Sequence, residues 1–353
     1  MNILVTGADG FLGSNITREL LSRQYQVTAF ISSDSTSTTL DRLPVERFTG
    51  NILNRQDVER AMDGCDAVVH AAASTNVWPS RSERVRAINI EGTDHLIRAA
   101  LKRDCQRFLF IGSAGSFGFG TEIDPGDETR PFRGRKYRLD YIESKLEAQH
   151  RVLRAVAQHD LPAIVLNPTF MIGPYDSKPS SGAMIKAIYE QKLPGYSRGG
   201  RNYIYVKDAA KAIVNALTMG RIGECYILGH ENMNYREAFS RMARVIGVPA
   251  PRLPIPLWAG VLYGGAGSIY GALTQIPPTV TYTMARMAHD RHYYTGQKAV
   301  DELAMPQTNL DIAIQESFQW MKEHGILKPK KTVRRIPRLS GTAVVRRRNR
   351  YGK

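Results

Sequence analysis

The sequence Thr6-Gly7-Ala8-Asp9-Gly10-Phe11-Leu12-Gly13 decides the fold of this chain. It follows an apolar run at residues 2–5, which predicts a short buried strand, and it precedes residues 14–21, where apolar side chains recur at helical spacing. In a strand-to-helix turn the first glycine allows the tight bend, the second lets backbone approach a pyrophosphate, and the third lets the helix pack closely on the strand. The segment therefore predicts a nucleotide-binding turn, with the phosphates at the helix N-terminus.

Further apolar runs predict buried strands at residues 27–31, 67–70, 108–111 and 163–166. Helical spacing marks the stretches 81–103 and 139–159 between them. Strands that alternate with helices predict an α/β fold with a Rossmann-type, doubly wound parallel sheet.

The regular alternation loosens after residue 166, and loops rich in Pro, Gly and Ser follow. We therefore expect a Rossmann domain over residues 1–166, to which residues 201–228 return. Residues 167–200 and 229–327 would form a smaller, interleaved C-terminal substrate-binding domain.

The composition is that of a globular protein. With 353 residues, 42% of them hydrophobic, the chain can bury a large core. It lacks an apolar run of about 18 residues, and a strand that starts at residue 2 leaves no room for a signal peptide, so we expect a cytoplasmic protein. Cys65, Cys105 and Cys225 are widely spaced and match no metal-binding pattern, so we expect no metal site.

The formal net charge is +15, and most of it lies in one segment. Residues 328–353 contain 11 Lys and Arg and no acid, which leaves 37 bases against 33 acids in residues 1–327. Two interpretations of this basic tail stay open. It could be a disordered, solvated extension, which we favour, or it could contact nucleic acid or an anionic membrane, which would make the protein peripheral to that membrane.

Residues 253–285 carry no charge, and the stretch 257–273 is apolar but contains five glycines. This stretch could be a helix that dips into a membrane surface. It could also be a buried or lid helix that covers an apolar substrate. We favour the second interpretation, because glycines weaken a helix at an interface.

The segment Tyr141-Ile142-Glu143-Ser144-Lys145 suits proton transfer. Residues four apart share one face of a helix, and an ammonium group beside a phenol lowers the pKa of that phenol. The same spacing occurs at Tyr203 and Lys207, which begin in a strand-like run, and at Tyr294 and Lys298, which span a glycine. Only the first pair lies in a strongly helical stretch.

Ser113 is the expected partner of Tyr141. It follows the strand predicted at 108–111, and it therefore lies at the carboxyl edge of the sheet. Open α/β folds bind their ligands at this edge.

The glycine turn, Ser113 and the Tyr141-to-Lys145 segment together resemble the extended short-chain dehydrogenase/reductase family, also called the NAD-dependent epimerase/dehydratase superfamily. The resemblance covers nearly the whole chain. Further similar segments are residues 63–73, 89–93, 167–174 and 205–208. Within the family, the chain looks most like the dihydroflavonol-4-reductase-like and hopanoid-associated epimerase-like branch, especially over residues 161–235.

The resemblance implies a catalytic role for three residues. Tyr141 would be the general acid or base, Lys145 would lower its pKa and bind the nicotinamide ribose, and Ser113 would hydrogen-bond the substrate oxygen. Asn89 could support this site from its helix, although we favour a structural role for it.

The resemblance also implies a set of cofactor contacts. Besides Tyr141 and Lys145 it comprises Gly7, Asp9, Gly10, Phe11, Leu12, Gly13, Ser32, Asn51, Ile52, Ala71, Ala72, Ala73, Asn167 and Pro168. Relatives that bind NAD usually end the second strand with an acid, whereas residues 29–33 contain none here. Ser32 and Ser33 could bind a 2′-phosphate, and Arg42 could reach it, so NADP(H) is favoured over NAD(H).

Two enzymatic functions follow from the resemblance. We favour an NADP-dependent oxidoreductase that acts on a ketone, aldehyde or secondary alcohol of an apolar small molecule. The alternative is a nucleotide-sugar epimerase or dehydratase with tightly bound NAD, because Arg201 resembles an arginine that such enzymes use on the diphosphate. A companion Arg-x-Gly-Asp pattern is absent at residues 286–291.

Two further expectations concern assembly and loss of function. By analogy alone, a homodimer could form through the helices expected at 85–103 and 140–158. A cofactor-binding protein without activity is a third functional class, and the intact Ser113, Tyr141 and Lys145 argue against it.

Overall fold

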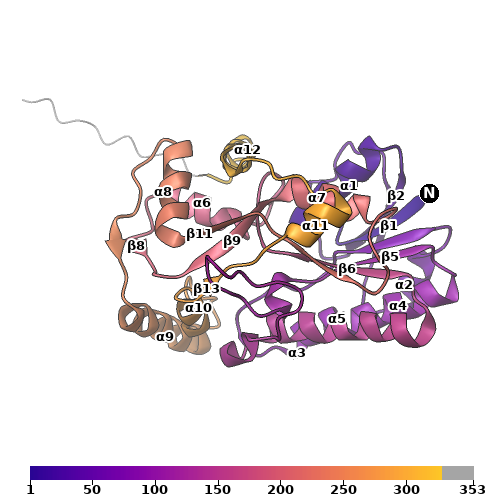
Figure 1. Ribbon diagram of the computed structural model, residues 1–353, viewed down its shortest axis with the longest axis horizontal. Coiled ribbons are helices and arrows are strands. Elements are labelled where there is room, and N and C mark those ends of the chain that lie inside the picture. The colour runs from indigo at the N-terminus through magenta and orange to yellow at the C-terminus, as the bar shows by residue number, and fades with distance from the viewer. Residues whose placement is uncertain (328–353) are drawn as a thin grey trace, which may run out of the picture.

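The computed structural model describes residues 1–327, and its main feature is a seven-stranded parallel sheet (Figure 1). The strands follow the order β10-β6-β5-β4-β1-β2-β3. They are β1 (Asn2–Thr6), β2 (Gln26–Ser32), β3 (Glu46–Gly50), β4 (Ala67–His70), β5 (Arg107–Ile111), β6 (Ala163–Pro168) and β10 (Cys225–Leu228). The α/β fold of Rossmann type is thus confirmed. The basic tail at 328–353 lies outside the described residues, as do its expected contacts.

The strand order places the ligand edge of the sheet. From β1 the chain adds β2 and β3 on one side of the sheet. It then crosses to the other side of β1 and adds β4, so the direction in which strands are added reverses between β1 and β4. In open α/β sheets ligands bind at such a switch point, beyond the carboxyl ends of the strands. The glycine turn follows β1, and Ala71, Ala72 and Ala73 follow β4, so both lie at this position.

Five strands were predicted from apolar runs, and all five are present. The two strands that were not predicted, β3 and β10, are the edges of the sheet. Strand β3 has the sequence Glu46-Arg47-Phe48-Thr49-Gly50 and exposes most of its side chains, so it contains no apolar run. Strand β10 has only four residues.

Helices cover both faces of the sheet (Figure 1). Along β1, Ile3 and Val5 belong to one core cluster and Leu4 to another, because successive side chains of a strand point to opposite faces. The first face is covered by α1 (Phe11–Ser22) and α7 (Val206–Asn215). The second is covered by α2 (Arg55–Ala61), α4 (Gly92–Lys102) and α5 (Asp140–His159), with α3 (Glu83–Arg86) and a π-helical turn (Ala87–Glu91) leading into α4.

The chain also forms a second, smaller sheet. Strand β9 (Gly200–Tyr205) pairs with β7 (Phe170–Ile172), β11 (Glu231–Asn234) and β13 (Arg291–His292). The other elements are α6 (Gly182–Tyr189), β8 (Gly195–Tyr196), α8 (Tyr235–Val245), β12 (Leu253–Pro254), α9 (Leu257–Thr274), α10 (Tyr282–Met287), α11 (Gln297–Leu303) and α12 (Leu310–Glu323). Because β9 belongs to this smaller sheet, the return to the large sheet expected over 201–228 begins at α7 and continues into β10.

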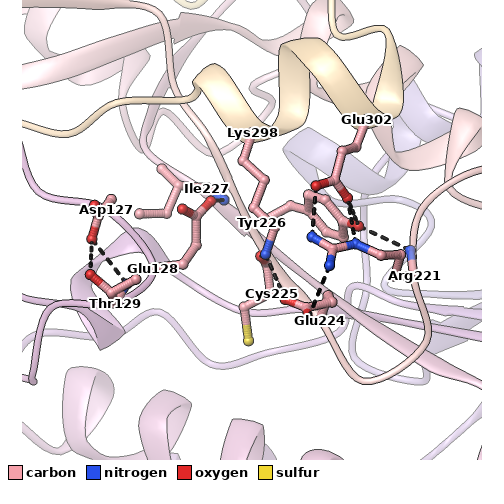
Figure 2. Close-up of polar contacts among 10 residues, drawn as sticks. All are labelled: Asp127, Glu128, Thr129, Arg221, Glu224, Cys225, Tyr226, Ile227, Lys298 and Glu302. Carbon is pink, nitrogen blue, oxygen red and sulfur yellow. Dashed lines mark hydrogen bonds and ion pairs between the residues drawn. The ribbon is translucent and has the colours of Figure 1, made fainter.

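A polar cluster covers the free edge of β10 (Figure 2). The backbone N–H of Ile227 donates to the Glu128 carboxylate over 2.6 Å. From α11, Lys298 donates to Glu224 over 2.6 Å and to the Cys225 carbonyl over 2.9 Å, and Glu302 accepts from Tyr226 over 2.6 Å. These contacts fix α11 on the edge strand and block pairing with another strand. Lys298 therefore binds the edge strand β10, and its ammonium does not lie at the carboxyl edge of β5.

Helix α9 lies on the surface, so it is not a buried helix, whereas a role as a lid over an apolar substrate stays a prediction. Only Gly264 and Gly271 of this helix are buried. Large apolar side chains such as Trp258 and Leu273 are exposed. Among the described helices, none is long and apolar enough to cross a membrane.

Candidate active site

The glycine turn between β1 and α1 requires glycine at two positions. Gly7 has φ +65°, and a Cβ there would lie 2.8 Å from the Ala72 Cα. A Cβ at Gly13 would lie 2.0 Å from the Gly7 carbonyl oxygen. Helix α1 begins at Phe11 with Gly10 as its N-cap, so no side chain stands over the first turn. These distances agree with the tight bend and the close packing expected at this turn.

The loop after β2 folds back onto the turn through Asp9. The Ser35 hydroxyl donates to the Asp9 carboxylate, and the hydroxyls of Ser37 and Thr39 donate to the Asp9 carbonyl over 3.0 and 2.9 Å. Asp9 therefore holds this loop beside the glycine turn. Ser32, the last residue of β2, is exposed at the same edge.

The other predicted cofactor residues lie at the carboxyl edge, and several of them already have partners within the protein. Ala71 and Ala72 donate their backbone N–H groups to Thr6. Leu12 belongs to the core, as does Ile52, whose side chain lies beside Gly92. The Asn51 amide oxygen accepts the Leu53 N–H over 3.0 Å in a local turn. Contact between these residues and a cofactor stays a prediction.

The residues present fit a dinucleotide. The glycine turn offers a backbone cradle that a Cβ would fill, since a Cβ at Gly10 would come within 3.2 Å of the Gly7 carbonyl oxygen. At the other end, Asn167 donates to the Ser113 carbonyl over 3.1 Å and to Gln149 over 2.8 Å. Its own Oδ1 is buried and has no hydrogen-bond partner among residues 1–327. A buried acceptor of this kind is usually satisfied by a ligand or by water.

Tyr141 and Ser113 meet as predicted. Tyr141 lies in the first turn of α5, Ser113 follows β5, and their side chains are hydrogen-bonded. Burial raises the pKa of Tyr141, whereas the Ser113 hydrogen bond and the positive charge of Arg201 act to lower it. The net effect raises the pKa of Tyr141, so the phenol is protonated at neutral pH.

Lys145 contacts the end of β5, and its expected contact with a nicotinamide ribose stays a prediction. It lies one turn after Tyr141 and is buried, but its ammonium donates to the Ile111 carbonyl and lies 4.6 Å from the centre of the Phe110 ring. Burial lowers the pKa of Lys145 to about 7. The cation that lowers the pKa of Tyr141 is Arg201.

Residue spacing does not predict that Arg201 acts on Tyr141. Arg201 lies on β9 of the smaller sheet, donates to the Tyr235 hydroxyl over 2.6 Å and stacks 5.0 Å above the Phe170 ring. Its charge, together with burial as the larger cause, also lowers the pKa of His292 to about 3. The link depends on packing between the two sheets, which residue spacing does not reveal.

A cavity of about 190 Å³ opens beside Ser113 and Tyr141. Most of its lining side chains are aromatic or aliphatic, and the described lining includes one arginine and no acid. The residues that line it are Ser113, Ala114, Gly115, Phe117, Phe119, Gly134, Tyr137, Tyr141, Ile142, Pro168, Thr169, Phe170, Arg201, Asn202, Met287, His292 and Tyr294. The predicted Pro168 is thus at the cavity, whereas Asn167 lies behind Ser113.

Asn89 positions elements of the site. Its side chain accepts the Ser74 N–H over 2.7 Å and donates to the Ser74 carbonyl and to the Ser144 hydroxyl over 3.1 and 2.9 Å. It thereby joins the loop after β4 to α5, which carries Tyr141. Its place in a π-helical turn is typical of functional regions.

Replacing Arg201 with glutamine should move the pH profile of any reaction in which Tyr141 transfers a proton. A cation stabilises phenolate, so its removal raises the pKa of Tyr141. In alcohol oxidation, where phenolate is the base, the acidic limb of kcat/KM should therefore shift to higher pH. The matched control is Arg291→Gln, an exposed arginine at the start of β13, which should leave the profile in place. An unchanged profile in the Arg201 variant would show that Arg201 does not act on Tyr141.

Metal chemistry has no evident site in residues 1–327. That part of the chain holds no group of three His, Cys, Asp or Glu side chains placed to bind an ion. Burial raises the pKa of the Cys225 thiol to about 12, so this cysteine is a poor ligand or nucleophile.

Comparison with known proteins gives consistent results. Residues 3–229 match the model of the NAD dependent epimerase/dehydratase family. The chain is 31% identical over 329 residues to the Synechocystis sp. protein named "Putative dihydroflavonol 4-reductase". The aligned region covers 92% of this chain and 95% of that protein. It is 26% identical over 332 residues to sterol demethylase protein B of Methylococcus capsulatus, over 93% and 100% of the two chains. The crystal structure of gox2253 superimposes with a TM-score of 0.81 at 29% identity, over 92% of this chain and 99% of that one.

Proposed function

This chain belongs to the NAD dependent epimerase/dehydratase family, and we propose that it is an NAD(P)-dependent oxidoreductase that interconverts a carbonyl and a secondary alcohol on an apolar small molecule. The observation that carries the proposal is the cavity beside Ser113 and Tyr141. Six of its seventeen lining residues are Phe or Tyr, and aromatic rings favour a flat, apolar ligand.

The residues at the cavity supply the proton chemistry. In reduction, the Tyr141 hydroxyl donates its proton to the carbonyl oxygen, while the Ser113 hydroxyl hydrogen-bonds the same oxygen. In oxidation, the Tyr141 phenolate accepts the proton of the alcohol. Arg201 stabilises that phenolate. A bound nicotinamide would supply or take up the hydride.

The names of the relatives support an apolar substrate. One relative is named for reduction of a dihydroflavonol and another for demethylation of sterols, and both names refer to ring systems. The present cavity offers aromatic side chains on which such a ring system could stack. We propose only this class of substrate.

Cofactor exchange tests the proposed reaction. An enzyme with net oxidation or reduction must release its cofactor in every cycle, whereas an epimerase returns the hydride and can retain it. We expect purified protein to bind NADPH reversibly in a fluorescence titration and to lose it on gel filtration. NAD that survives gel filtration at a one-to-one ratio would contradict the proposal and favour the epimerase.

The nucleotide-sugar alternative has less support in the cavity. A diphosphate carries two negative charges, and Arg201 is the one cationic side chain in the described lining. Arg286 lines a neighbouring cavity, and Arg291 is exposed at the start of β13. In the described lining of the cavity beside Tyr141, no second arginine joins Arg201.

We further propose that NADP(H) is the preferred cofactor. Ser32 ends β2, where an acid would repel a 2′-phosphate. Asp34 is the nearest acid along the chain, and its exposed carboxylate lies 3.9 Å from Arg84, which partly offsets its charge. The loop at Ser32 is therefore compatible with the additional phosphate.

The Ser32→Asp variant should reverse this preference. A carboxylate beside the 2′-phosphate should raise the Kd for NADPH relative to that for NADH by at least about tenfold. Parallel fluorescence titrations with the two cofactors measure the ratio. Ser22→Asp, at the other end of α1, is the matched control and should leave the ratio unchanged. An unaltered ratio in the Ser32 variant would place the 2′-position elsewhere.

A further inference from the structure

Most of the exposed large apolar side chains gather in one short region. Within residues 1–327, eleven of sixteen such side chains fall within residues 253–284. They are Leu253, Leu257, Trp258, Leu262, Tyr263, Ile269, Tyr270, Leu273, Ile276, Tyr282 and Met284. We call this group the apolar face. Figure 1 places its helices, α9 and α10, at the opposite end of the molecule from the N-terminus.

Helix α9 has one packed side and one exposed side. Its packed side is made of glycines: a Cβ at Gly264 or Gly267 would lie 2.6 Å from the carbonyl oxygen of Thr281 or Val280. The exposed side carries Trp258 and Leu273, which are 68% and 80% exposed. The glycines therefore let α9 lie close against residues 278–281, and this contact directs the large side chains outward.

A basic cavity adjoins the apolar face. It has a volume of about 300 Å³, and four cationic side chains line it together with Tyr282 of the apolar face. The four are Arg81, Lys136, Arg138 and Arg286. Arg81 is paired with Asp140 and Glu143, and Lys136 with Asp290. In the described part of the chain, Arg138 and Arg286 have no acidic partner, so the cavity keeps a net positive charge.

We propose that the apolar face docks the protein onto a bilayer that contains anionic lipids. Aliphatic side chains would enter the acyl boundary, and Trp258, Tyr263 and Tyr270 have the amphipathic rings that favour the headgroup level. Arg138 and Arg286 would lie beside the lipid phosphates, whose negative charge matches the basic cavity. Residues 253–285 contain no acid that would oppose this approach.

The charge pattern favours a membrane over a second copy of this chain. In a twofold dimer through the apolar face, the same cations from both copies would lie near one another and repel. An anionic bilayer instead provides the opposite charge. Charge complementarity therefore favours an anionic bilayer as the occupant of the apolar face.

The location of α10 connects the bilayer with the active site. Tyr282 and Arg286 line the basic cavity, whereas Met287, one residue later, lines the cavity beside Tyr141. An apolar substrate dissolved in the bilayer would thus be close to the catalytic residues. Access of such a substrate to the active site rests on the proposed function, whereas docking does not. Docking is measured without substrate or cofactor.

Sedimentation with vesicles tests the proposal on the full-length chain. We expect binding to vesicles of phosphatidylcholine with phosphatidylglycerol, and weaker binding to phosphatidylcholine alone. The double variant Leu262→Gln and Leu273→Gln should lower the partition coefficient by at least about tenfold, because glutamine keeps the helix but not the apolar contact. The matched control is Ile123→Gln, at a side chain that is 96% exposed outside the apolar face, and it should bind like the parent protein. Equal binding by the double variant would overturn the proposal, as would equal binding to both vesicle types.

Trp258 separates docking of the apolar face from attachment by the basic residues 328–353. Brominated lipid should quench the emission of Trp258 when vesicles are added, and Trp258→Phe should lose this quenching while it still binds. Binding without quenching of Trp258 would show that another part of the chain attaches to the vesicle and would overturn the proposal. Self-association that the double variant abolishes, in protein that does not bind vesicles, would identify a second copy as the occupant and would also overturn it.

Discussion

Replacing Tyr141 with phenylalanine should lower kcat by about 10²- to 10⁴-fold, the usual contribution of a general acid or base. The phenol is hydrogen-bonded to Ser113 and faces the substrate cavity, so the change removes the proton donor and keeps the ring. The Kd for NADPH should stay nearly the same. Steady-state kinetics and a fluorescence titration on the same preparation separate the two effects.

The chain provides a matched control in Tyr203→Phe. Tyr203 also precedes a lysine by four residues, but it is buried in β9, and its hydroxyl has no hydrogen-bond partner in the part of the chain that the structure describes. Loss of that hydroxyl should leave turnover unchanged and should not destabilise the protein. If Tyr141→Phe kept full activity, Tyr141 would have no part in proton transfer.

Of the single glycine-to-alanine substitutions in the glycine turn, Gly13→Ala should lower the free energy of unfolding most. A Cβ at this position would lie 2.0 Å from the Gly7 carbonyl oxygen, which is backbone and cannot move aside cheaply. We expect a loss of at least about 3 kcal/mol in the free energy of unfolding, together with loss of cofactor binding. Chemical denaturation without cofactor measures the stability.

Gly10→Ala provides the comparison. Its Cβ would lie 3.2 Å from the same oxygen, a contact that a small shift relieves. We expect little change in stability but at least about tenfold weaker NADPH binding, because the methyl group would occupy the space where backbone approaches the pyrophosphate. Equal stability of the two variants would mean that α1 and the turn are less tightly packed than the structure shows.

The sequence was sufficient where structure depends on local pattern. The buried strands of the large sheet are continuous apolar runs, and the glycines of the turn have a spacing that only a strand-to-helix turn explains. The pairing of Ser113 with Tyr141 could also be predicted, because both positions follow from where a strand ends and where a helix begins. Strand β3 escaped prediction because its edge position leaves its side chains in water.

Residue spacing was insufficient where structure depends on contacts between distant elements. Arg201 acts on Tyr141 across the contact between the two sheets, and the Lys145 ammonium lies against Ile111 and Phe110. Helix α9 illustrates a different reason. A helix that is apolar on all sides has the same composition whether it is buried or exposed, so its position could not be read from its residues.

Stoichiometric turnover of an apolar ketone tests the central claim most directly. Purified enzyme, NADPH and a panel of flat cyclic ketones would be followed by nicotinamide absorbance, and the alcohol product would be quantified in the same sample. The account predicts that one ketone gives one mole of alcohol per mole of NADPH oxidised, and that Tyr141→Phe abolishes this turnover. Interconversion of nucleotide sugars with no net change in nicotinamide absorbance, and no reduction of any ketone, would contradict it.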